Sequence, residues 1–146
     1  MNDRALFFRY LAQTSGSPLA LEVDRAEGVF MFNRTGKAYL DLISGISVSV
    51  LGHRHPAIIR AVKEQLDRYM HLMVYGEFVQ SPQVELACLL TDNLPPALDN
   101  VYLVNSGSEA VEGALKLAKR HTRRTEIVAF GNAYHGSTHG ALSVAG

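Results

Sequence analysis

The sequence predicts an α/β protein in which a small α+β segment precedes the start of a larger parallel sheet. Three observations support this prediction: strand-like pieces near the N-terminus, helical periodicity in the middle, and a strand–helix–strand order after Pro96. A strand–helix–strand unit is the building block of parallel sheets. We therefore expect residues 1–55 to form the N-terminal part and residues 56–146 to begin the larger domain.

The N-terminal part begins with the apolar spacing of a short amphipathic helix over residues 3–13, which ends at residues 15–18 (Ser-Gly-Ser-Pro). Strand-like pieces follow at residues 19–23, 28–32 and 38–43. The last two flank a turn at residues 33–37, in which a positive φ is expected at Gly36. We expect these pieces to form a small antiparallel meander.

Helical spacing dominates the middle of the chain. One helix is predicted to begin at Pro56, because proline is favoured in a first turn and apolar residues then recur every three or four positions. A second helix begins at Ser81 and ends before Pro95.

Two apolar runs after Pro96, residues 101–104 and 126–130, have the pattern of strands covered on both faces. A helix over residues 107–121 is predicted between them. Two strands do not make such a sheet stable alone, and the chain stops within the alternation. We therefore expect the sequence to be truncated.

Composition limits the class of protein. Fourteen basic and fourteen acidic residues cancel, which disfavours nucleic-acid binding. No apolar stretch reaches membrane-spanning length and no signal peptide is recognisable, so we expect a cytoplasmic protein that does not bind membranes. Cys88 is the one cysteine, and its apolar surroundings predict a buried structural thiol rather than a nucleophile.

The segment Asn-Ser-Gly-Ser-Glu-Ala at residues 105–110 lies between a predicted buried strand and a helix. Unpaired N–H groups and the dipole favour an anion at such a helix start. Gly107 permits close approach of a phosphate, and Ser108 offers both its N–H and its hydroxyl. Ser106 with Glu109 also matches a capping box, which needs no ligand. This segment alone leaves anion binding and simple capping open.

The glycine-rich residues 131–140 follow the second predicted strand, so they lie at the same carboxyl edge, where ligands bind in open α/β sheets. Tyr134 can stack there on a planar ring, although an ordinary loop with a half-buried tyrosine explains the pattern too. His135 and His139 are four residues apart, but the intervening glutamate and the third ligand of a metal site are missing. We expect no metal.

Taken in order, these segments resemble the class III aminotransferases, which depend on pyridoxal phosphate (PLP) and include acetylornithine, ornithine and 4-aminobutyrate types. The matching segments are residues 36–41 (Gly-Lys-Ala-Tyr-Leu-Asp), 52–56 (Gly-His-Arg-His-Pro), 105–110 with Glu112, Ala114, Lys116, Leu117 and Ala118, and 134–138 (Tyr-His-Gly-Ser-Thr). The last two segments, at this separation in the sequence, make the resemblance specific. The resemblance implies the N-terminal part of a fold type I PLP-dependent transferase and a homodimer with active sites at the subunit interface.

The resemblance also implies roles for individual residues. Gly107 and Ser108 match the backbone donors to the PLP phosphate, with Ser106 beside them. Tyr134 matches the aromatic residue that stacks on the cofactor ring, and His135 is its neighbour in the pocket wall. The family usually has arginine where Ser137 stands in this chain.

The implied reaction moves an amino group from an ornithine-, acetylornithine- or 4-aminobutyrate-like donor to a 2-oxo acid. The family's PLP-binding lysine and its pyridine-binding aspartate match positions beyond Gly146. We therefore assign no catalytic residue and expect these 146 residues alone to be inactive. The alternative function is a non-catalytic PLP- or phosphate-binding fragment or interaction module.

Overall fold

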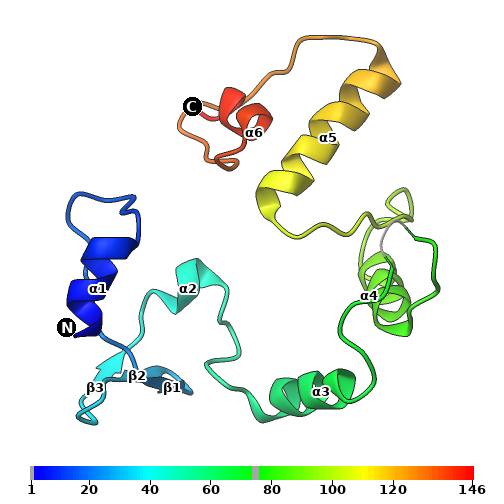
Figure 1. Cartoon of the computed structure of the whole chain (residues 1–146). Helices are drawn as coiled ribbons and strands as arrows, with labels where there is room; N and C mark the ends of the chain where they lie inside the picture. The colour runs from blue at the N-terminus through cyan, green and yellow to red at the C-terminus, as the bar shows by residue number, and fades with distance from the viewer. Residues whose placement is uncertain (1, 74–75) are drawn as a thin grey trace. The chain divides into compact units, whose positions relative to one another are not determined.

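The computed structural model describes residues 2–73 and 76–146. The chain divides after residue 74 into two compact units. The first contains helices α1, α2 and α3 and a three-stranded sheet, and the second contains helices α4, α5 and α6 (Figure 1). The division after residue 74 separates compact units of this chain, whereas the boundary expected after residue 55 separates the two domains. That domain boundary stays a prediction.

Helix α1 (Asp3–Tyr10) confirms most of the predicted N-terminal helix. The Asn2 side chain caps it by accepting a hydrogen bond from the Ala5 N–H at 3.0 Å. The helix is shorter than predicted because Leu11 adopts an extended backbone and its carbonyl accepts the Gln13 side-chain amide at 2.7 Å.

The sheet is an antiparallel meander of strands β1 (Arg25–Glu27), β2 (Phe30–Phe32) and β3 (Ala38–Leu40). The predicted turn between β2 and β3 is confirmed: Gly36 has a φ of 82°, and the Asn33 carboxamide oxygen accepts the Lys37 N–H at 2.9 Å. The strand predicted at residues 19–23 is wrong, because the pairing with β2 starts only next to the tight turn at Gly28.

A contact between backbones joins this sheet to the segment before helix α3 (Pro56–Leu66). The N–H of Gly28 donates to the His53 carbonyl at 3.0 Å, and the N–H of His53 donates to the Gly28 carbonyl at 2.7 Å. Gly52 permits this approach, because it has a φ of 78° and a Cβ there would lie 2.9 Å from the Gly28 oxygen. The Gly-His-Arg-His-Pro segment is therefore a packing element that leads into the helix predicted at Pro56.

Asp41 strengthens the same junction. Its carboxylate lies 2.7 Å from His53 Nε2 and accepts the N–H groups of Ser44 at 2.9 Å and Ile43 at 3.0 Å. These contacts lead into the short helix α2 (Ser44–Ser47), which the sequence pattern did not predict. The Ser44 amide, followed by the His53 ring, lowers the pKa of Asp41 below its ordinary value.

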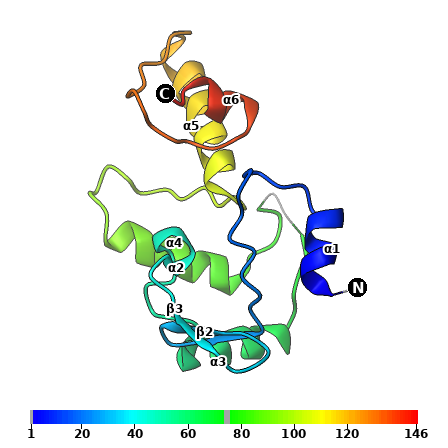
Figure 2. The same ribbon diagram turned by 90° about the vertical axis from the view of Figure 1, so that its left-hand side faces the viewer.

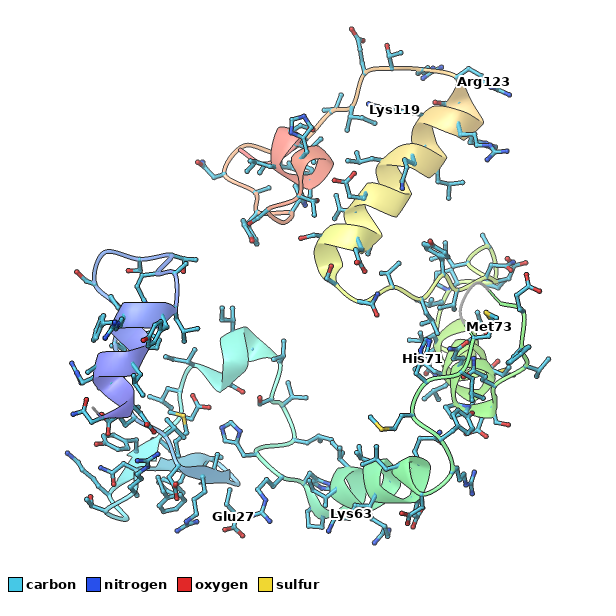
Figure 3. All side chains as sticks on the ribbon, viewed as in Figure 1. Glu27, Lys63, His71, Met73, Lys119 and Arg123 are labelled. Carbon is cyan, nitrogen blue, oxygen red and sulfur yellow. The ribbon has the colours of Figure 1, made fainter. Side chains whose placement is uncertain are left out.

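In the second unit, helices α4 (Ser81–Asp92) and α5 (Gly107–Thr122) confirm two predicted helices. Basic side chains gather in the last turn of α5, where they complement the dipole, and Arg123 ends the helix in the left-handed conformation (Figure 3). A short helix α6 (His139–Ser143) lies beside α5 (Figures 1 and 2).

Two predictions of buried strands are wrong. Residues 101–104 and 126–130 form neither helix nor strand, and within the described residues they pair with no strand. The side chain of Val128 is 99% exposed and that of Phe130 is 87% exposed. A strand needs a neighbour for its N–H and C=O groups, and no described segment provides one for either run.

Dense packing is confined to one place. Of the residues that the structure describes, only Gly136 and Ala141 are fully buried, and both lie where α5 meets the segment around α6. The prediction that Cys88 is buried is wrong: it is exposed on α4, which has no contact with another helix or strand among the described elements. No helix in the described ranges combines the length and apolar character needed to cross a bilayer.

Replacing Gly52 with alanine is expected to lower the free energy of unfolding by about 2 kcal/mol or more, because the new Cβ meets both an unfavourable φ and the Gly28 carbonyl. Gly36→Ala is the matched control, since it has a similar φ and open space around its Cβ, and should cost about 1 kcal/mol. Urea denaturation measures both. Equal losses would contradict the close approach.

Asp41→Asn is expected to destabilise the protein at neutral pH and to have little effect in acid. A carboxyl whose pKa is lowered by folding contributes stability above its ordinary value of 3.8, and this contribution is lost as the pH falls through the lower folded pKa. The stabilities of wild type and variant, measured from pH 7 downward, should therefore converge as the pH falls below 3.8 and through the lowered pKa of Asp41. A difference that is independent of pH would exclude the ionised Asp41 as its source.

Candidate functional site

The first turn of α5 is held by the predicted capping box. The Ser106 hydroxyl accepts the Glu109 N–H at 3.2 Å. In return the Glu109 carboxylate accepts the N–H of Asn105 at 2.7 Å, one residue before the cap. The loop is therefore fixed by groups of the protein itself.

This cap leaves two donors available. No described residue accepts a hydrogen bond from the main-chain N–H of Gly107 or Ser108. Gly107 is exposed, and the position of a Cβ on it has no atom within 4 Å. Both amides occupy the first turn of a helix of 16 residues, where the dipole favours negative charge. Capping and anion binding are thus compatible in this loop.

The loop of residues 131–140 meets this turn directly. Gly136 is buried against Ser108: a Cβ on Gly136 would lie 2.7 Å from the Ser108 Cβ and 3.0 Å from its Cα. Gly136 also has a φ of 126°, which strains any other residue. The structure therefore brings together the two segments that the sequence placed at one edge, although neither belongs to a sheet.

Tyr134 and His135 immediately precede this contact. The Tyr134 side chain is 79% exposed, and its hydroxyl lies 3.1 Å from Ser137 Oγ. His135 is half-buried. The phenol is thus tethered at its tip by the residue that stands where the family usually has arginine, while the ring stays accessible to a planar ligand.

Glu112 matches the family pattern in the sequence, but its role in this region was not predicted. Its carboxylate Oε1 accepts the N–H of Gly140 at 2.8 Å and that of Ala141 at 3.3 Å. A hydrogen bond from the Thr138 hydroxyl, followed by the Gly140 amide, lowers the pKa of Glu112. The available signal was its spacing: Glu112 follows Ser108 by four residues, so the two share a helix face.

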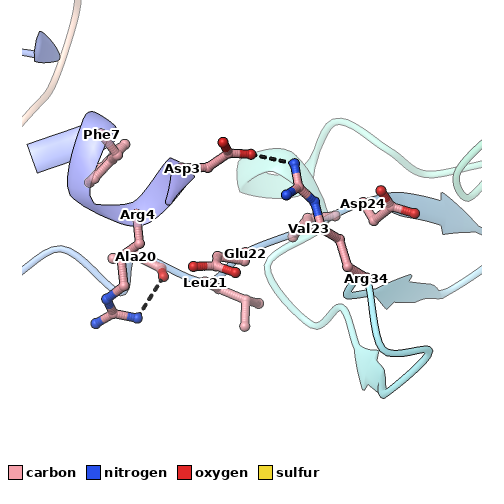
Figure 4. Close-up of a pocket in the computed structure, with 9 residues that line it drawn as sticks. All are labelled: Asp3, Arg4, Phe7, Ala20, Leu21, Glu22, Val23, Asp24 and Arg34. Carbon is pink, nitrogen blue, oxygen red and sulfur yellow. Dashed lines mark hydrogen bonds and ion pairs between the residues drawn. The ribbon is translucent and has the colours of Figure 1, made fainter. Parts of the chain in front are cut away.

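Other chemistry finds little support. In the described ranges no group of three or more His, Cys, Asp or Glu side chains is arranged to hold a metal ion. A pocket of about 270 Å³ lies in the first unit, between α1 and residues 20–24 (Figure 4). The two arginines that line the pocket already have partners in the protein: Arg34 pairs with Asp3, and Arg4 donates to the Ala20 carbonyl at 3.2 Å.

A capped helix start with two open amides, packed against a glycine loop that carries a tyrosine, is the arrangement expected from the class III resemblance. The family model for class III aminotransferases matches residues 10–146. The chain therefore belongs to the class III aminotransferase family, whose members depend on PLP. The predicted family, fold type and cofactor are confirmed at this level.

The individual relatives that the chain resembles are aminotransferases. The chain is 43% identical to acetylornithine aminotransferase of Methanopyrus kandleri, over 98% of this chain and 36% of that protein. Among solved structures, adenosylmethionine-8-amino-7-oxononanoate aminotransferase of Methanocaldococcus jannaschii has a TM-score of 0.90 and 30% identity, covering 97% and 35% of the two chains. Taurine:2-oxoglutarate aminotransferase of Bifidobacterium kashiwanohense, in complex with PLP and glutamate, has a TM-score of 0.76 and 31% identity, over 94% and 31%. The chain thus spans about a third of the length of these relatives.

Gly136→Ala is expected to push the loop away from Ser108, because a Cβ there overlaps the serine side chain. Gly131→Ala is the control, since its Cβ would have no atom within 4 Å. Hydrogen exchange measured by mass spectrometry should show faster exchange across residues 131–140 in the first variant only. The same protection in both variants would contradict the contact.

Proposed function

We propose that this chain supplies the phosphate cradle and ring-stacking loop of a PLP-dependent aminotransferase. The proposed cofactor contacts are Ser106, Gly107, Ser108, Tyr134 and His135. The observation that supports the proposal best is the contact of Gly136 with Ser108, because it joins the loop of Tyr134 to the helix start that carries the open amides.

The α5 start suits the phosphate group. The amides of Gly107 and Ser108 have no protein acceptor among the described residues, and a phosphate oxygen can accept both. Hydrogen bonds to a charged oxygen are about twice as strong as those between neutral groups. The helix dipole adds about 0.3–1 kcal/mol for an exposed anion. Ser106 beside the two amides holds the turn in shape, because its hydroxyl accepts the Glu109 N–H.

The loop of residues 131–140 suits the ring. A tyrosine stacked on an aromatic ring contributes about 0.5–1.5 kcal/mol beyond the area it buries. The hydrogen bond between the Tyr134 hydroxyl and Ser137 restricts the phenol before a ligand arrives. A restricted side chain loses less conformational entropy on binding. His135, half-buried beside it, is proposed to close the pocket wall.

Bound PLP supplies an electron sink for the carbon from which a proton leaves. The role of this chain is to hold the phosphate and orient the ring, and we assign it no catalytic residue. The lysines of α5, Lys116 and Lys119, lie in its second half, away from the first turn that forms the cradle. We propose that the PLP-binding lysine and the aspartate at the pyridine nitrogen lie outside these 146 residues, which alone would bind without transamination.

The proposed donors are acetylornithine, ornithine and 4-aminobutyrate, with a 2-oxo acid as acceptor. Acetylornithine stands first because several relatives at about 43% identity carry that name. The complete enzyme is proposed to be a cytoplasmic homodimer without nucleic-acid or membrane partners. The alternative function is a PLP- or phosphate-binding module without catalysis.

The cofactor contacts can be tested with the protein expressed from its natural reading frame. Tyr134→Ala is expected to raise the Kd for PLP about tenfold, whereas Tyr134→Phe keeps the ring and should stay within about threefold of wild type. Tyr10→Ala, in the other unit, is the matched control. Absorbance titration measures all four proteins. Unchanged affinity in Tyr134→Ala would remove the stacking role, and no PLP binding by wild type would refute the proposed function.

A spectroscopic screen with amino donors then separates the two functions. An aminotransferase should convert the absorbance of bound PLP to that of its amino form with acetylornithine, and 2-oxoglutarate should restore it. Borohydride should trap a lysine adduct in an enzyme and none in a simple binding module. No response to acetylornithine, ornithine or 4-aminobutyrate would exclude the proposed donors.

A further inference from the structure

Glu112 connects the two halves of the candidate site without belonging to either. It lies one helical turn after Ser108 on α5, and its carboxylate accepts the amides of Gly140 and Ala141 at the start of α6. The loop thus touches α5 twice, first through Gly136 at Ser108 and then through these amides at Glu112. Tyr134 lies two residues before the first contact.

The carboxylate takes the place of a missing helix cap. Thr138 is the N-cap residue of α6, yet its side chain makes no capping hydrogen bond. The Glu112 carboxylate instead accepts the Gly140 and Ala141 amides of α6, which a cap would normally accept. The start of α6 is therefore held by a residue of α5 and not by its own loop.

Charge and shape both favour glutamate here. A carboxylate accepts the two amides in charge-assisted hydrogen bonds, whereas a glutamine has no charge and adds N–H donors of its own beside these amides. The Thr138 hydroxyl and these amides lower the pKa of Glu112, which keeps the group ionised at neutral pH. Gly140 makes room, since a Cβ on it would lie 2.8 Å from the Glu112 carboxyl carbon.

We propose that Glu112 is a positioning residue for the PLP ring. It holds the Tyr134 loop at the spacing from the Gly107 and Ser108 amides that a single cofactor needs to reach both, and it does not touch the cofactor. This inference rests on the proposed function. It implies that loss of Glu112 weakens the ring contact and leaves the phosphate cradle intact, because Ser106 and Glu109 hold that cradle independently.

The test compares Glu112→Gln with wild type in the protein expressed from its natural reading frame. Glu126→Gln is the matched control, because Glu126 is an exposed carboxylate of the same unit. Three readouts are needed: the Kd for PLP, the competition of inorganic phosphate against PLP, and the circular dichroism of the bound chromophore. Glu112→Gln should raise the Kd for PLP about tenfold and reduce the dichroism, with phosphate competition within about twofold of wild type.

A second variant guards against simple unfolding. Thr138→Val removes the hydroxyl that contributes to the lowered pKa of Glu112 and leaves both amides, so it should shift the same readouts in the same direction by a smaller factor. A merely structural Glu112 would weaken phosphate and PLP equally, and that result would overturn the inference. Unchanged PLP affinity and dichroism in Glu112→Gln would also overturn the inference about Glu112, but would leave the proposed function standing. Absence of PLP binding by wild type would overturn both.

Discussion

The geometry of the candidate site depends on how the loop of residues 131–140 is fastened to α5. Gly136 packs on Ser108, and one turn further along the helix the Glu112 carboxylate holds the amides of Gly140 and Ala141. The two fully buried residues of the described chain lie in this loop and in α6. A steric contact and a charged hydrogen-bond cluster, rather than a broad apolar core, therefore set the position of Tyr134 relative to the helix start.

The first unit uses the same construction. Asp41 accepts two main-chain N–H groups and contacts the ring of His53, and Glu112 likewise accepts two main-chain N–H groups. In each unit a glycine allows a close approach: Gly52 to the Gly28 backbone in the first, and Gly140 to the Glu112 carboxylate in the second. A carboxylate that accepts several donors stays charged and orders the loop around it. Both units thus combine one such carboxylate with one such glycine.

Local signals in the sequence predicted the four longer helices, α1, α3, α4 and α5, and the turn at residues 33–37, but not the short helices α2 and α6. Pro56, the Ser81-Pro82 pair and the Ser106 cap mark helix starts that the structure confirms, because capping and proline geometry depend on neighbouring residues only. The turn at residues 33–37 followed from glycine and asparagine in the same way. The strands failed where they required partners: residues 101–104 and 126–130 have strand-like patterns but no neighbour among the described residues.

The sequence by itself determined the family and named the segments of the candidate site, since both rest on residue types at fixed spacing. It also contained the capping box of α5, which is local. Only the tertiary structure decided that Gly136 lies on Ser108, that Glu112 caps α6, and that Cys88 is exposed. Those facts depend on contacts between residues up to 29 positions apart, and no local pattern specifies which distant group fills a given hydrogen bond or covers a given face.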